Sequence, residues 1–155
     1  MASVTTMRDR SAVDWALFVA RVIVGVIFVA HGAQKLLGAF GGPGLAAVVQ
    51  MMGPLGYLVT IGEFFGGLGL IFGLLTRVAA FGVFCNMVVA VAMVHRQFGF
   101  FMNWTGAQKG EGYEYHLLAL AVTAFLMVRG AGAASADRLL SSSANDRLKA
   151  RLQAA

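Results

Sequence analysis

Four long apolar stretches alternate along the chain with short polar or glycine-rich segments. They cover about residues 15–37, 55–75, 76–94 and 115–131. A helix needs roughly 17–25 predominantly apolar residues to cross the hydrocarbon core of a bilayer. The pattern therefore predicts an all-α membrane protein, built as a bundle of four transmembrane helices.

The segments outside the predicted helices are short. Residues 1–14 form a polar N-terminal tail, and residues 132–155 form a basic C-terminal tail rich in alanine and serine. A glycine-rich connection joins the first two helices, and residues 95–114 form a longer loop. We therefore predict one transmembrane domain over residues 15–131, flanked by two tails.

Composition narrows the class of protein further. Hydrophobic residues make up 59% of the chain and charged residues only 12%, about half the charged share of a soluble domain. The net charge is +5, but no basic segment is interleaved with surface aromatics, so we predict no nucleic-acid partner. Membrane lipid is the expected environment. The single cysteine, Cys85, excludes an internal disulfide.

The basic residues are distributed unevenly between the two ends of the predicted bundle. The positive-inside rule assigns the end richer in Lys and Arg to the cytoplasm. We therefore predict a multi-pass inner (plasma) membrane protein with both termini cytoplasmic and the 95–114 loop facing outward. The richer end has Arg8, Arg10, Arg77, Arg129, Arg138, Arg147, Lys149 and Arg151, and the other end has Lys35, Arg96 and Lys109.

Ionisable side chains interrupt the apolar stretches, where each costs at least about 2.5–3.5 kcal/mol to insert. In the predicted topology, six of them map to the outer half of one bundle, and this convergence predicts a polar pocket near the outer leaflet. Asn86 adds an amide in the third helix, which could equally join two helices. The six are His31, Lys35, Glu63, His95, Glu114 and His116.

Structural roles compete with functional ones for several of these residues. Lys35 is close enough to a helix end to reach the headgroups, and His31 could bond a carbonyl of a neighbouring helix. Glu63 is harder to explain in this way, because a carboxyl group two turns inside an apolar helix must be neutral or paired. His31 or Lys35 is the expected partner. Near the inner end, Arg21 is expected to reach the interface or to pair with Asp137.

In order and spacing, these residues resemble the DoxX family of small bacterial membrane proteins. The resemblance implies a four-helix bundle whose recurring polar residues correspond to His31, Lys35, Glu63, His95 and Glu114. Some relatives are subunits of thiosulfate:quinone oxidoreductase, and others are linked to redox stress and act with partner proteins. The matching segments are Ala30-His31-Gly32-Ala33-Gln34-Lys35-Leu36, Gly62-Glu63-Phe64-Phe65-Gly66-Gly67, Gly73-Leu74-Leu75-Thr76-Arg77, Gly112-Tyr113-Glu114-Tyr115 and Ser135-x-Asp137.

The leading hypothesis is a quinone-reactive subunit of a membrane oxidoreductase, linked to sulfur compounds or redox stress. Glu63, His31 and Lys35 are the predicted catalytic residues, because they could bind a ring carbonyl and move a proton. Ubiquinone or menaquinone is the expected cofactor, with none bound covalently, and a protein partner is expected to supply electrons or substrate. The predicted ligand-binding residues are Phe64, His95, Glu114, His116 and Asn86.

Two alternatives stay open from the sequence alone. The bundle could be a non-catalytic scaffold or carrier that docks a redox partner through its aromatic 95–114 loop, or that binds a small lipophilic molecule. It could also hold a metal or haem through its histidines and carboxylates, although their spacing matches no known ligand motif and no residue is assigned to a metal. The glycine-lined helices are compatible with self-association.

Overall fold

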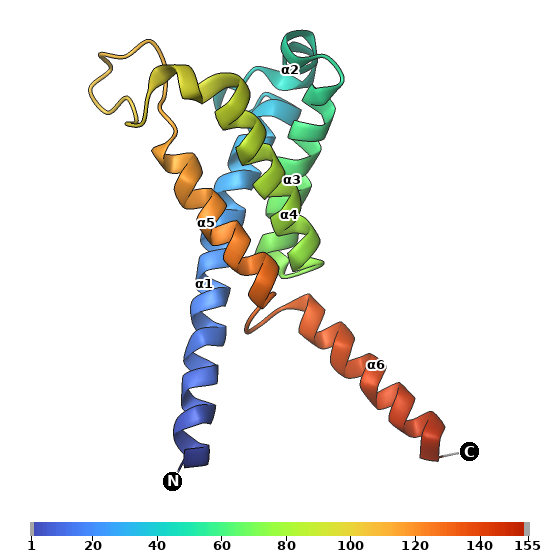
Figure 1. Ribbon diagram of the computed structural model, residues 1–155. Coiled ribbons are helices and arrows are strands. Elements are labelled where there is room, and N and C mark those ends of the chain that lie inside the picture. Colours follow the sequence, from blue (N-terminus) through green and yellow to red (C-terminus); the bar gives the residue numbers. More distant parts are fainter. Residues whose placement is uncertain (1, 154–155) are drawn as a thin grey trace.

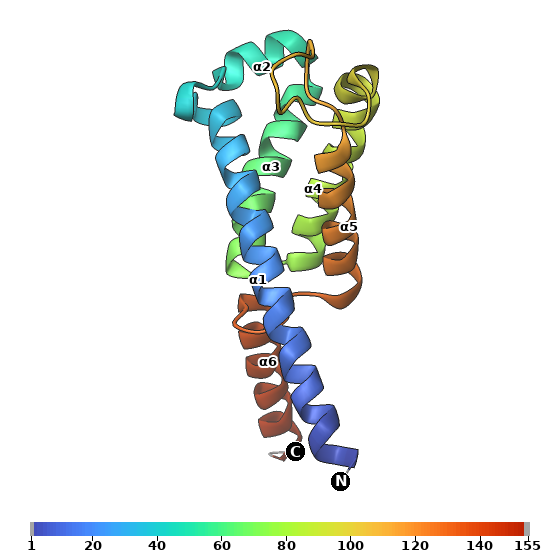
Figure 2. The ribbon, with the colours of Figure 1, turned by 90° about the vertical axis from the view of Figure 1, so that its left-hand side faces the viewer.

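Six α-helices make up the computed structural model, which describes residues 2–153; their connections are short except for the loop of residues 99–113. No strand occurs within these residues. Helices α1, α3, α4 and α5 run side by side as a bundle, and α2 lies across one end, called here the α2 end (Figures 1 and 2). The first turns of α1 and the whole of α6 extend beyond the opposite end of the bundle, called here the terminal end. The bounds are α1 Ala2–Leu37, α2 Gly44–Met52, α3 Leu55–Phe72, α4 Thr76–Ala90, α5 Glu114–Arg129 and α6 Ala136–Gln153.

Three segments are long and apolar enough to cross a membrane, namely Arg10–Leu37, Leu55–Phe72 and Thr76–Phe98. The last combines α4 with a π-helical turn, η2 (Val91–His95), and a 3-10 turn, η3 (Arg96–Phe98). The predicted all-α membrane bundle is thereby confirmed. Helix α5 has 16 residues, or about 24 Å of helix, against a hydrocarbon core of roughly 30 Å. The count of four spans stays a prediction.

The segments expected to be tails are helical in the structure. Residues 2–14 continue α1 without a break, and residues 136–153 form α6. Neither segment contains glycine or proline, the residues that most strongly disfavour a helix. The start of α6 is also capped, because the backbone N–H of Arg138 lies 3.4 Å from the hydroxyl of Ser135. Polar composition alone therefore did not indicate where helices stop.

Glycines bring α1 and α3 into unusually close contact. A Cβ atom on Gly32 would lie 2.5 Å from the Cα of Phe64, and one on Gly25 would lie 2.8 Å from the carbonyl oxygen of Gly67. Small residues permit this approach, which is a common device in membrane helix pairs. The contact fixes the height of α1 against α3, and therefore the relative positions of the polar residues that the two helices carry.

Arg21 joins three elements near the terminal end of the bundle. Its side chain is fully buried, and its guanidinium donates to five backbone carbonyls. The acceptors are Leu70 and Ile71 at the end of α3, and Ala131, Ala133 and Ala134 in the linker between α5 and α6, at 2.5–3.1 Å. The last carbonyls of a helix lack partners within the helix. Arg21 therefore supplies donors at the end of α3, where Leu70 also accepts from the backbone N–H of Gly73 at 3.3 Å.

Asp137 has a different role from the one expected of it. Arg21 donates to carbonyls rather than to this carboxylate, which instead accepts from the backbone N–H groups of Leu75 and Thr76 at 2.7 and 2.9 Å. These N–H groups open α4, where a carboxylate is favourable because it caps the helix and complements its dipole. Asp137 therefore ties the start of α6 to the start of α4.

Candidate functional site

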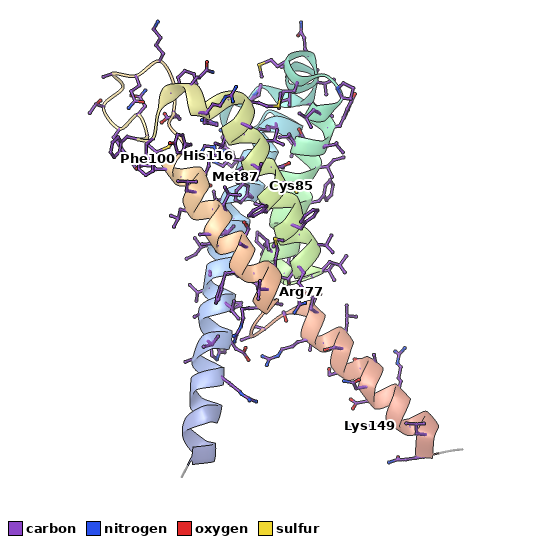
Figure 3. The ribbon with its side chains drawn as sticks, in the orientation of Figure 1. Arg77, Cys85, Met87, Phe100, His116 and Lys149 are labelled. Atoms are coloured by element: carbon purple, nitrogen blue, oxygen red, sulfur yellow. The ribbon has the colours of Figure 1, made fainter. Side chains whose placement is uncertain are left out.

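A cavity of about 540 Å³ lies between the helices in the half of the bundle nearer the α2 end. This volume falls within the usual range for small-molecule sites. Half of its lining residues are apolar, and the rest carry amide, imidazole, hydroxyl, ammonium or carboxyl groups. Figure 3 labels two of the lining residues, Met87 of α4 and His116 of α5, at this level of the bundle. The polar lining residues are His31, Lys35, Glu63, Asn86, His95, Glu111, Tyr115 and His116.

The most buried charges of the cavity are an ion pair between α1 and α3. The ammonium of Lys35 donates to Oε2 of Glu63 at 2.5 Å, with side-chain exposures of 26% for Lys35 and 6% for Glu63. Pairing removes much of the cost of placing two charges in an apolar bundle. His31 lies one helical turn before Lys35 and is itself exposed, so it stands at the rim of the cavity.

Two histidines form the opposite wall. The rings of His95 and His116 lie 4.0 Å apart between centroids, with 40° between their planes. Nδ1 of His95 lies 2.8 Å from the carbonyl oxygen of Glu111. Because a carbonyl can only accept a hydrogen bond, Nδ1 of His95 carries the proton and Nε2 of neutral His95 is left as an acceptor. The π-helical turn that carries His95 widens the helix locally, and such turns are frequent at functional sites.

Two buried polar atoms of this wall have no hydrogen-bond partner within the described part of the chain. They are the hydroxyl of Tyr115 and Nδ1 of His116. Nearly all buried polar groups in native proteins are paired. The wall therefore holds hydrogen-bonding capacity that the protein itself does not use.

Asn86 contributes to the cavity and also holds two helices together. Its side-chain N–H donates to the carbonyl oxygen of Val59 on α3 at 2.8 Å, so the structural role considered for this amide is present. A Cβ atom on Gly62 would lie 2.7 Å from the same nitrogen. The glycine therefore leaves the space that lets Asn86 reach across to α3.

Two predicted site residues lie outside the cavity wall. Glu114 turns toward the loop that precedes it, where its carboxylate accepts from the backbone N–H of Met102 and from the indole of Trp104. The ring of Phe64 packs edge-on against Phe65, and its backbone lies against Gly32.

Two polar lining residues were not among the predicted site residues. Tyr115 precedes the predicted His116 and could have been included as its neighbour. Glu111 is an exposed residue of the loop, and no sequence signal distinguishes it from an ordinary solvated charge. Both residues line the cavity.

The described residues hold no group of three or more His, Cys, Asp or Glu side chains arranged to bind a metal ion. The histidine pair and the Lys35–Glu63 pair lie on opposite walls. The Glu63 carboxylate is ion-paired with Lys35 and so is not free to bind a metal. The arrangement is therefore better suited to an organic ligand with hydrogen-bonding groups than to a metal.

A helical bundle with three segments long and apolar enough to cross a membrane defines a multi-pass integral membrane protein. The DoxX family model matches residues 16–96. The chain is also 32% identical to inner membrane protein YqjF of Escherichia coli (strain K12) over 130 residues, which make up 82% of this chain and 93% of that relative. No solved structure matches the chain. The protein belongs to the DoxX family and is a multi-pass inner membrane protein.

Proposed function

We propose that the protein is the quinone-reactive subunit of a membrane oxidoreductase linked to sulfur compounds or redox stress, and that the cavity binds the quinone ring. The observation that carries the proposal is the Lys35–Glu63 pair in the wall of a cavity with many apolar residues. A quinone ring is apolar at its faces and accepts hydrogen bonds at two carbonyl oxygens. Such a ligand matches a cavity that combines apolar surface with a few convergent polar groups.

Reduction of a quinone to a quinol consumes two electrons and two protons. Lys35 would donate a hydrogen bond to one carbonyl oxygen and stabilise the negative charge that develops there. Both protons would come from water at the open rim of the cavity: the Glu63 carboxylate would take up one and pass it to that oxygen, and the second carbonyl oxygen would take the other directly. The chain has one cysteine and so cannot supply electrons from a dithiol of its own. A partner protein that oxidises a reduced sulfur compound is the proposed electron donor. Ubiquinone and menaquinone both satisfy this chemistry.

The test is binding of a short-tailed ubiquinone analogue to the detergent-purified protein. Wild type is expected to bind, and Glu63→Gln is expected to bind about tenfold more weakly, which corresponds to about 1.4 kcal/mol. Asp146→Asn, an exposed carboxylate on α6, is the matched control and is expected to bind like wild type. Absence of binding by well-folded wild type would refute the proposal.

The apolar half of the cavity lining also supports a second candidate, a carrier for a small lipophilic molecule without redox chemistry. The same assay separates the two with a redox-inactive ring analogue that lacks the carbonyl oxygens. A carrier would bind this analogue as tightly as the quinone, with no effect of Glu63→Gln. A quinone site would bind it more weakly, because its polar groups would be left unpaired.

A further inference from the structure

The loop between η3 and α5 exposes large aromatic side chains at the α2 end of the bundle. Phe101 is 67% exposed and Trp104 is 86% exposed, and Phe100 beside them is also exposed. Contiguous exposed apolar side chains usually mark an interaction surface. We call residues 100–104 the aromatic segment. Neither the cavity chemistry nor the packing of the bundle uses its exposed rings.

Hydrogen bonds hold the aromatic segment in one conformation. One carboxylate oxygen of Glu114 accepts from the backbone N–H of Met102 at 3.0 Å and from the indole N–H of Trp104 at 3.2 Å. Glu111 accepts from the backbone N–H of Asn103 at 2.7 Å, and the Asn103 side chain bonds twice to the backbone of Gln108. The exposed rings are therefore held on the outside of a loop whose conformation is fixed by hydrogen bonds.

The aromatic segment continues the exposed apolar surface of α5. The backbone N–H of Glu114, the first residue of α5, donates to the carbonyl of Phe100 at 2.9 Å, which places Phe100 beside the first turn of that helix. Leu117 and Leu118 in that turn are exposed on the outside of the bundle. Figure 1 shows the loop reaching sideways from the bundle, and Figure 3 shows Phe100 on its side nearer α5.

We propose that the aromatic segment is seated in the headgroup layer of the leaflet at the α2 end, and that its partner is membrane lipid. Tryptophan and tyrosine concentrate at this depth because an indole or phenol has an apolar body and a polar edge. Residues 99–113 carry one lysine and one glutamate, so their net charge favours neither an acidic nor a basic protein partner. The same loop supplies Met102 and Glu111 to the cavity wall, so lipid seating fixes one wall of the cavity at the membrane surface.

Tryptophan fluorescence of the full chain in lipid nanodiscs tests this proposal. The chain has two tryptophans, Trp15 and Trp104, so Trp15→Phe leaves Trp104 as the reporter. Replacing the phosphatidylcholine with lipid brominated just below the headgroup is expected to lower the emission by roughly half or more, because the bromines contact an indole at that depth. Aqueous iodide is expected to quench it weakly.

The matched control is Trp104→Phe, which leaves Trp15, an exposed residue within the Arg10–Leu37 span. Its quenching by brominated lipid shows that the assay detects a lipid-facing indole. Strong iodide quenching of Trp104 without quenching by brominated lipid would overturn the proposal and indicate a water-facing surface for a protein partner. Insensitivity to both quenchers would also overturn it, and would indicate cover by a second copy. The assay contains no quinone, so its result does not depend on the proposed function.

Discussion

Replacement of Arg21 by methionine tests whether this residue stabilises the terminal end by bonding α1 to α3 and to the linker between α5 and α6. Methionine keeps much of the length and apolar stem of arginine but removes all donors. Five backbone carbonyls at the end of α3 and in the linker after α5 would then lose a partner. The bonds to Leu70, Ala131 and Ala133 are buried, so water reaches these three carbonyls only if the helices separate. We therefore expect a large loss of stability.

The size of the loss follows from the number of bonds. Side-chain hydrogen bonds in membrane proteins contribute about 0.6 kcal/mol each on average, which gives a lower bound of about 3 kcal/mol for five. Removing one member of a buried charged network typically costs about 3–5 kcal/mol. At about 2–4 °C for each kcal/mol in a chain of this size, we expect the melting temperature of Arg21→Met to fall by roughly 10 °C.

A thiol-reactive fluorogenic dye measures this shift in detergent, because unfolding exposes the single, half-buried thiol of Cys85. The matched control is Arg77→Met. Arg77 also lies near the terminal end (Figure 3), but it is exposed and makes one bond of 3.3 Å to the carbonyl of Val128. We expect the control to melt within about 2 °C of wild type. If Arg21→Met melted as high as Arg77→Met, the assigned role of Arg21 would be wrong.

Two further predictions concern the α2 half of the bundle. Gly32→Ala is expected to lower the melting temperature because its Cβ would overlap the backbone of α3. The control is Gly82→Ala on α4, which is expected to leave the melting temperature unchanged or slightly higher because no atom lies within 4 Å of the added Cβ. Equal melting temperatures of the two variants would contradict the close contact between α1 and α3. Lys35→Met is expected to cost about 3–5 kcal/mol because it leaves the Glu63 carboxylate buried without its partner, and adding Glu63→Gln is expected to recover part of that loss in the same thermal assay. Simple addition of the two single losses would show that the residues are not coupled.

The sequence alone predicted that several polar residues would lie together in one cavity. His31 and Lys35 are one turn apart, so they share a helix face, and alternation of helix direction brings Glu63, His95 and His116 to the same half of the bundle. These steps use only helix geometry and the order of the apolar stretches. The structure places all five residues in the cavity wall. Their predicted chemical roles stay predictions.

The sequence could not give the rotation of each helix about its own axis. Phe64 follows Glu63, but the approach of Gly32 places this part of α3 against α1, and the Phe64 ring lies outside the cavity wall. Glu114 opens α5, where its side chain turns back to bond the preceding loop. The direction of the Phe64 side chain depends on how α3 packs against α1, and that of Glu114 depends on how the preceding loop folds back. Neither leaves a periodic signal in the sequence.

For Arg21 the sequence predicted a structural role, either by reaching the inner interface or by pairing with Asp137, but it did not indicate the groups that Arg21 bonds. The structure supplies the negative ends of backbone dipoles, because the end of α3 and the linker after α5 converge around the guanidinium. Unpaired carbonyls exist at every helix end, so the sequence alone does not indicate which of them will be brought together.

Four buried polar side-chain atoms have no hydrogen-bond partner within the described residues: the hydroxyls of Thr60, Thr76 and Tyr115, and Nδ1 of His116. Of these, the Tyr115 and His116 atoms belong to residues that line the cavity, and these two bear on the functional assignment. A buried unpaired group costs about 1–3 kcal/mol. A fold selected for stability alone would replace such groups with apolar ones. Their presence beside a cavity is explained if a ligand there supplies the missing hydrogen bonds, so Tyr115→Phe should weaken binding of the quinone analogue while leaving the melting temperature of the ligand-free protein unchanged or higher.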